Sequence, residues 1–338
     1  MFSTRSKTRS RQTKTKMNDT KKCFVGIDTS NYTTSVSVAD EDGNVIANFK
    51  APLCVKSGER GLRQSDAVFA HIKNLPSLMD KLSEVLGCYE PLAVGASATP
   101  RMAEGSYMPC FLSGVAAAHS FAAANVIPIF KTAHQNGHVM AALYSSGAAE
   151  KLLSDRFLAF HVSGGTTEVL LITPKDDENI FDVELIGETE DINAGQAIDR
   201  VGVMLGLDFP AGKELEVFAS QYNGKLEKKK ICVKDCRCNL SGVENIAKKL
   251  YENGESKEKI AAFTFDFIQR TLCEMAEQAI QKFGEMPILF AGGVMSNRLM
   301  RGTISERFDA YFAEPEFSAD NAAGVALLCR LAYMKNKE

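Results

Sequence analysis

The chain has 338 residues, of which 45% are hydrophobic and 24% are charged, and its formal net charge is −3. This length and apolar content suffice for two domains, each with its own core. No apolar run approaches the roughly 18 residues that a membrane span needs, and the nine scattered cysteines follow no secretory signal. We therefore exclude a membrane-spanning protein and expect a cytoplasmic one with reduced thiols.

The N-terminal segment differs from the rest in composition. Residues 1–16 contain six Lys and Arg, no acid, and Phe2 as their only large apolar residue besides Met1. This composition predicts a disordered basic tail over residues 1–22, and Met17 leaves open whether residues 1–16 are translated. Without their six positive charges the chain carries −9. Any nucleic-acid contact must then rest on a local basic patch or on a partner.

Two segments show the same order of strands and turns. In residues 23–50, a strand ends at Asp28, the small polar turn Thr29-Ser30-Asn31 follows, and an alternating strand and a third strand come next. Residues 157–187 repeat this order around the turn Ser163-Gly164-Gly165-Thr166-Thr167. Such turns expose backbone N–H groups and hydroxyls that can surround a phosphate. Two of them predict a two-lobed nucleotide clamp, although two ordinary hairpins in a mixed α/β protein would show the same pattern.

The remaining periodicity completes two lobes. We expect a first lobe over residues 23–131 plus 318–338, because the final helix should pack back on it, and a second lobe over residues 132–317 with a helical insertion. Ser296 or Asn297 should cap the helix after Gly292-Gly293. The predicted helices cover residues 65–86, 114–124, roughly 193–284 and 320–335, and further strands cover residues 92–98, 126–130 and 287–291.

His134 and His138 stand four residues apart. On a helix this spacing places both imidazoles on one face, where they can hold one metal ion. Gln135 occupies the place of the Glu that acts as general base in H-E-x-x-H metalloproteases, which disfavours peptidase chemistry. Because a structural role for two such histidines is also possible, a third ligand is needed. Asp320 is the candidate, with helix N-capping as its alternative role.

Three other groups of residues are typical of binding sites. Asp199 and Glu216 can accept hydrogen bonds from ribose hydroxyls, and Gly212 lets a planar ligand approach the backbone, although Asp199 can also serve in a surface ion pair. The glycines at 292 and 293 end a strand, where α/β sheets bind ligands. The dense group Cys232, Cys236 and Cys238 could form a zinc knuckle, but no second Cys or His pair has fitting spacing.

Taken in order, these motifs resemble the tRNA threonylcarbamoyladenosine synthase family of the TsaD or Gcp type. The resemblance covers about residues 23–335. It implies an α/β fold of the actin-like ATPase (ASKHA) class, in which two duplicated lobes surround a nucleotide, as in sugar kinases and heat-shock chaperones. The matching motifs are G-I-D-T-S, H-x-x-x-H, S-G-G-T-T-E, A-I-D-R-x-G, L-S-G, G-G-V-x-x-N and D-N-A-A.

The resemblance also implies a reaction and its site. The family moves a threonylcarbamoyl group from threonylcarbamoyl-adenylate to N6 of the adenosine beside the anticodon of certain tRNAs, and a metal ion would polarise the carbamoyl carbonyl. Implied partners are tRNA, reached through partner subunits, and accessory synthase subunits of the TsaB and TsaE type. His134, His138 and Asp320 would hold one divalent ion, iron or zinc, and no catalytic residue is assigned. An adenylate or ATP-type nucleotide, with or without Mg, would be lined by Ser163, Gly164, Gly165, Thr166, Thr167, Asp199, Gly212, Glu216 and Asn297.

Two segments depart from the family pattern. Tyr32 and Thr33 stand where family members carry an acidic pair, and a loop over residues 100–107 with Arg101 replaces a G-P-G turn. Arg101 in this loop could meet an anion. These departures leave two alternatives open: a divergent paralogue that moves a carbamoyl-type group to another acceptor, and a nucleotide-binding, non-catalytic partner of the synthase. The intact metal residues disfavour the non-catalytic alternative.

Overall fold

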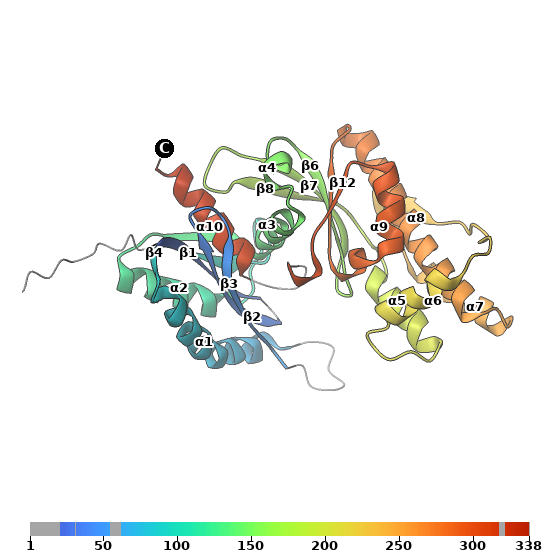
Figure 1. Ribbon diagram of the computed structural model, residues 1–338, viewed down its shortest axis with the longest axis horizontal. Helices are drawn as coiled ribbons and strands as arrows, with labels where there is room; N and C mark the ends of the chain where they lie inside the picture. Colours follow the sequence, from blue (N-terminus) through green and yellow to red (C-terminus); the bar gives the residue numbers. More distant parts are fainter. Residues whose placement is uncertain (1–20, 31, 55–61, 318–321, 338) are drawn as a thin grey trace, which may run out of the picture.

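A computed structural model of the protein describes residues 21–30, 32–54, 62–317 and 322–337. Two five-stranded mixed sheets lie side by side, each covered by helices (Figure 1). The first sheet has the order β3-β2-β1-β4-β5, in which β1 pairs antiparallel with β2 and parallel with β4. Its strands are β1 (Lys21–Thr29), β2 (Thr33–Asp40), β3 (Val45–Pro52), β4 (Tyr89–Thr99) and β5 (Ile129–Ala133), and its flanking helices are α1 (Gln64–Leu86) and α2 (Phe111–Asn125).

The second sheet repeats the first. Its order is β12-β11-β6-β7-β8, with β6 antiparallel to β7 and parallel to β11. The duplication predicted from the two hairpins is therefore confirmed. Its strands are β6 (Phe157–Val162), β7 (Thr167–Pro174), β8 (Phe181–Glu188), β11 (Ile288–Ala291) and β12 (Ala310–Phe312). The central strands β1 and β6 are apolar at consecutive positions because helices cover both faces of each sheet.

Helix α10 (Ala323–Lys335) returns to the first lobe, where it packs on β1, β4 and α3 (His134–Ser146). Two glycines permit this close approach. A Cβ at Gly324 would lie 1.8 Å from the carbonyl oxygen of Gly137, and a Cβ at Gly26 would lie 2.4 Å from the backbone nitrogen of Ala326. The expected return of the final helix to the first lobe is thus confirmed.

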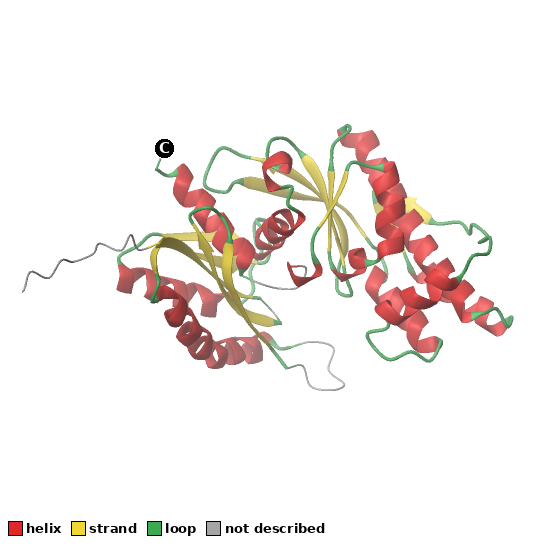
Figure 2. Cartoon of the chain, viewed as in Figure 1, coloured by secondary structure: helices red, strands yellow, loops and turns green. Residues whose placement is uncertain are grey.

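The stretch from residue 193 to 284 is not wholly helical as predicted. Helices α5 (Ala194–Met204), α6 (Gly212–Gln221), α7 (Ser241–Glu252) and α8 (Lys257–Phe283) are interrupted by a hairpin of two three-residue strands, β9 (Cys232–Lys234) and β10 (Arg237–Asn239), beside α8 (Figure 2). The hairpin turns at Asp235 and Cys236, whose positive φ angles are uncommon for residues other than glycine. The turn therefore lacks the glycine that would predict it. The apolar stripe of α8 is buried as expected.

Short elements complete the chain. They are α4 (Ala149–Leu152), η1 (Gly293–Ser296), α9 (Arg298–Arg307) and η2 (Pro315–Phe317). Asn297 caps α9 as expected, since its side-chain oxygen accepts a hydrogen bond from the backbone N–H of Met300. The strand predicted over residues 126–130 lies three residues later, because Val126 ends α2 in a left-handed conformation. Within the described residues, none of the helices combines the length and apolarity needed to cross a membrane.

Candidate functional site

The two histidines of the H-x-x-x-H motif face each other at the start of α3. Their Nε2 atoms are 2.9 Å apart. The Nδ1 of His134 donates to Oδ1 of Asp28, 2.9 Å away, and Asp28 is fully buried near the end of β1. When the ring is neutral, this bond leaves Nε2 of His134 unprotonated, so a carboxylate on β1 selects the tautomer of a histidine on α3.

This arrangement has some of the features of a metal centre. Metal-binding histidines usually donate their second ring N–H to a carboxylate, as His134 does to Asp28, and the Nε2 atoms of His134 and His138 lie within hydrogen-bond distance of each other. The predicted third ligand, Asp320, lies outside the described residues. No group of three or more metal-ligating side chains occurs within the described ranges. The structure thus brings together the two histidines, and it adds Asp28 as a positioning carboxylate that sequence reasoning missed.

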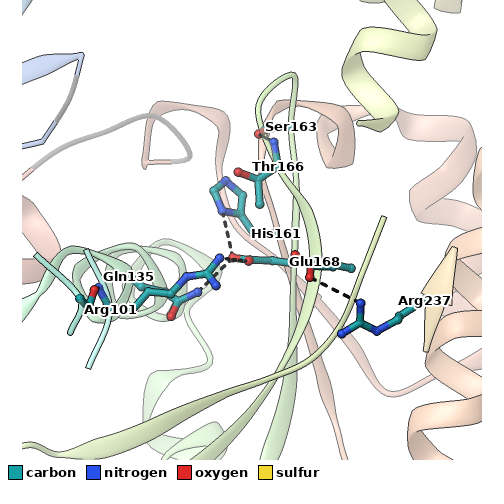
Figure 3. Close-up of polar contacts among 9 residues, drawn as sticks. Arg101, Gln135, His161, Ser163, Thr166, Glu168 and Arg237 are labelled. Carbon is teal, nitrogen blue, oxygen red and sulfur yellow. Dashed lines mark hydrogen bonds and ion pairs between the residues drawn. The ribbon is translucent and has the colours of Figure 1, made fainter. Parts of the chain in front are cut away.

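A second polar cluster surrounds Glu168 on β7 (Figure 3). Its carboxylate is 4% exposed and accepts hydrogen bonds from Arg101 at 2.9 Å and Gln135 at 3.1 Å, and Nδ1 of His161 lies 3.9 Å away. Burial raises the pKa of Glu168, against the lowering effects of Arg101 and the hydrogen bond from Gln135. The anion that Arg101 meets is therefore a carboxylate of the other lobe.

Neither Glu168 nor His161 was among the predicted site residues. His161 lies on β6, with its ring 5.3 Å from the ring of His138. The sequence did contain a signal for both, because each is an ionisable residue within an otherwise apolar strand. The polar cluster thus extends from the histidine pair on α3 to the second sheet.

A large pocket opens in the second lobe beside the Ser163 turn. It has an empty volume of about 1190 Å³, including space open to solvent. Six of the nine predicted binding residues line it: Ser163, Gly164, Asp199, Gly212, Glu216 and Asn297. The other three shape the turn instead. Gly165 and Thr166 donate their backbone N–H groups to Oγ of Ser163, and buried Thr167 accepts from the backbone of Ala194.

The carboxylates of this pocket also fix its walls. Oδ1 of Asp199 accepts from the backbone N–H of Ala211 at 2.9 Å, and Oε1 of Glu216 accepts from the backbone N–H of Arg298 at 2.7 Å. Asp199 therefore holds the loop before α6, and no ion pair of its side chain occurs in the described part of the chain. Hydrogen bonds from the backbone therefore fix the positions of both acidic side chains at the pocket wall.

Asn297 presents a donor that the protein does not use. The side chain is 5% exposed, and its Nδ2 has no hydrogen-bond partner among the described residues although its Oδ1 caps α9. A buried amide donor without an acceptor costs about 1–3 kcal/mol. An acceptor atom of a ligand in this pocket would remove that cost.

The sequence is similar to those of a known protein family. A sequence model of the family described as tRNA N6-adenosine threonylcarbamoyltransferase (TsaD) matches residues 44–327. The chain belongs to this family. A relative of that name from Neorickettsia sennetsu is 28% identical over 316 residues, covering 90% of this chain and 91% of the relative. One from Streptococcus uberis is 32% identical over 240 residues, covering 67% of each.

Solved structures agree on the fold of this TsaD family member. The crystal structure of HypF from T. kodakarensis has a TM-score of 0.60 at 14% identity, and the match covers 94% of this chain. A glucokinase of the ROK family from Streptomyces griseus has a TM-score of 0.50 at 12% identity, covering 92% of this chain and 99% of its own. The chain spans about half the length of HypF, 48% in this case. The predicted ASKHA-type α/β fold is thereby confirmed.

The cysteine group of the family member does not support a zinc knuckle. Cys236 and Cys238 are buried, whereas Cys232 is exposed. Burial raises the pKa of the Cys238 thiol to about 12, which opposes the ionisation that a zinc site requires. Cys236 and Cys238 instead belong to the core beneath the β9–β10 hairpin, and Cys232 lies on the surface of the hairpin.

Proposed function

We propose that this protein transfers a threonylcarbamoyl group from threonylcarbamoyl-adenylate to N6 of the adenosine beside the anticodon of tRNA. The observation that carries the proposal is the unpartnered, buried amide of Asn297 in a large pocket, in a protein that also holds a convergent pair of histidines. Membership of the TsaD family supports the type of reaction.

The adenylate would bind in the pocket beside α5 and α6. The Ser163–Gly164 turn exposes backbone at its wall, and a Cβ at Gly164 would have no atom within 4 Å, so this space is open to a phosphate. The amide of Asn297 would donate to an oxygen or ring nitrogen of the nucleotide. Asp199 and Glu216 each use one carboxylate oxygen to hold the pocket wall, and their second oxygens would accept from ribose hydroxyls.

A divalent metal ion, iron or zinc, would be held by His134, His138 and Asp320, with Asp28 orienting His134. The bound ion supplies Lewis acidity toward the carbamoyl carbonyl. The protein's own contribution is to hold the neutral imidazole of His134 with Nε2 unprotonated and to place it beside His138.

The acceptor tRNA would require additional positive surface. From residue 17 onward the chain carries a formal charge of −9, which opposes long-range attraction of a polyanion. Accessory subunits of the TsaB and TsaE type would therefore assist the reaction.

Reconstitution tests the proposal directly. The purified protein is combined with an enzyme that supplies threonylcarbamoyl-adenylate, accessory subunits and an unmodified tRNA that reads codons beginning with A. Mass spectrometry of the digested tRNA should detect the modified nucleoside. Gly164→Val should abolish the product by filling the phosphate space, whereas Gly302→Val, which also meets no atom within 4 Å, should keep it. A protein that binds metal and adenylate but gives no product with any subunit set contradicts the proposal.

A second candidate is transfer of a carbamoyl-type group to a different acceptor. Tyr32 is 45% exposed at the start of β2, where the family's acidic pair is missing, and Arg101 is held against Glu168. In the same assay, turnover of the adenylate with another acceptor and without tRNA would favour this candidate.

A further inference from the structure

One surface segment reverses the acidic character of the protein. Residues 225–237, which include the β9–β10 hairpin, contain six basic and two acidic residues and carry +4. Lys225, Lys228, Lys230 and Lys234 are exposed and form no ion pair within the described residues, whereas Lys229 pairs with Glu227. Positive charge is thus concentrated here and only partly compensated.

The segment is held firmly in place. The guanidinium of Arg270 on α8 donates to the backbone carbonyl of Lys229 at 2.9 Å. Gln278, also on α8, accepts from the backbone N–H of Cys236 at 3.1 Å. Cys238 is fully buried in the core of the second lobe. The basic side chains therefore project from a backbone that α8 and the core fix.

The hairpin brings like charges together. Lys234 and Arg237 are directly opposite in the β9–β10 ladder and both are exposed. Like charges opposite each other in a sheet are destabilising. The nearby acids compensate only in part, because Asp235 lies in the turn and the carboxylates of Glu188 and Glu190 are 3.9 and 4.0 Å from Arg237. A bound polyanion would remove this repulsion.

The basic segment adjoins the polar cluster of the site. Thr189, just after β8, forms an isolated bridge with Cys238 of β10. Glu188 pairs in register with Glu168, and Figure 3 shows Arg101 and Arg237 on the two sides of Glu168. The hairpin and the polar cluster therefore flank the same pair of strands, β7 and β8.

We infer that the segment of residues 225–237 is a docking surface for the phosphate backbone of the acceptor RNA. The inference rests on the proposed function for the identity of the RNA, and on the charge of the segment for the contact itself. Exposed, fixed lysines bind phosphates through counterion release, which makes affinity depend on salt. The surface would hold the RNA by its backbone and contribute no sequence preference.

The test measures RNA binding separately from transfer. Fluorescence anisotropy of a labelled, unmodified tRNA transcript is recorded with the full chain at salt concentrations between about 50 and 200 mM. The triple variant Lys228→Gln, Lys230→Gln, Lys234→Gln should lower the affinity at least about tenfold and reduce the salt slope by about three. The matched control Lys73→Gln, Lys81→Gln, Lys131→Gln removes the same charge from exposed lysines of the first lobe and should change neither.

The outcomes separate the two proposals. If the hairpin variant binds tRNA like the wild type, or if the wild type binds no tRNA at low salt, the docking surface is overturned, whether or not transfer occurs in the reconstituted system. If the hairpin variant selectively loses affinity and salt dependence while no tRNA is ever modified, the surface stands and the proposed reaction fails. Equal loss in both triple variants would indicate general charge attraction and would also overturn the surface.

Discussion

The guanidinium of Arg101 lies 2.9 Å from the carboxylate of Glu168, and this ion pair joins the loop after β4 to strand β7 of the other lobe. The partners differ in exposure, since the side chain of Arg101 is 45% exposed and that of Glu168 is 5% exposed. The pair therefore anchors a solvent-facing loop to a buried carboxylate beside the histidines. Its removal should affect the contact between the lobes more than the core of either one.

The carboxylate of Glu168 should make stability depend on pH. Burial raises the pKa of Glu168 in the folded protein, so its contribution to stability is fully present below the pKa of an unfolded Glu and is lost as the pH rises through the folded pKa. Thermal unfolding of metal-free protein should therefore show Glu168→Gln gaining stability relative to the wild type as the pH rises above the usual pKa of Glu. Arg101→Gln should cost about 1 kcal/mol at neutral pH, because solvent screens the exposed guanidinium. A pH-independent difference for Glu168→Gln would refute this account.

Metal binding should depend on both histidines and on Asp28. The variant His134→Ala, His138→Ala should lose the approximately one ion per chain expected from metal analysis. Asp28→Asn should keep the fold but weaken metal affinity about 10- to 100-fold, because His134 loses its orienting carboxylate. His119→Ala removes an exposed histidine of α2 and serves as the control. Full metal content in the double variant would rule out the site.

Two substitutions at Asn297 should separate its role as helix cap from its role toward ligand. Asn297→Ser keeps a capping oxygen for the backbone of Met300 but lacks the amide donor, whereas Asn297→Ala loses both. Both should weaken adenylate binding in calorimetry, and only the Ala variant should lose about 1 kcal/mol of stability in the absence of ligand. Unchanged adenylate affinity in the Ser variant would remove Asn297 from the nucleotide site.

His71 should give the opposite pH dependence to Glu168. Its buried ring contacts the hydroxyl of Thr34 at 2.9 Å, and burial lowers its pKa, opposed by the carbonyl of Ser30 and the charge of Asp28. Its contribution to stability is present above the unfolded pKa of about 6.5 and is lost as the pH falls through the lower folded value. His71→Asn should lower the free energy of unfolding by about 1–3 kcal/mol at pH 7. The melting temperature of this variant should also fall less than that of the wild type as the pH is lowered. If the melting temperature of this variant falls with decreasing pH as steeply as that of the wild type, the pH dependence does not come from His71.

The duplicated sheets could be predicted because alternation and small polar turns recur at matching places in both halves. The hairpin at residues 232–239 could not, because its strands have three residues each and its turn uses Asp235 and Cys236 in place of glycine. The histidine pair was predictable from spacing along one helix. The partners of Glu168 were not, because Arg101 and Gln135 come from segments 67 and 33 residues away in the chain.

The grouping of binding residues was predictable only in part. Six of the residues that the family resemblance implied line one pocket. The sequence could not reveal that Thr167 is buried against the start of α5, since this depends on how β7 meets that helix. Nor could it show that Asp199 and Glu216 also hold backbone N–H groups from other segments. Asp320 lies outside the described residues, so its assignment stays a prediction.

The position of α10 has a consequence for the order of folding during synthesis. The first lobe contains β1 near the N-terminus, yet α10, the last described helix, covers β1 and β4. A ribosome makes both sheets before it makes this helix, so the first sheet has one apolar face uncovered until synthesis is nearly finished. Nascent chains therefore pass through a state in which the N-terminal half needs protection from aggregation.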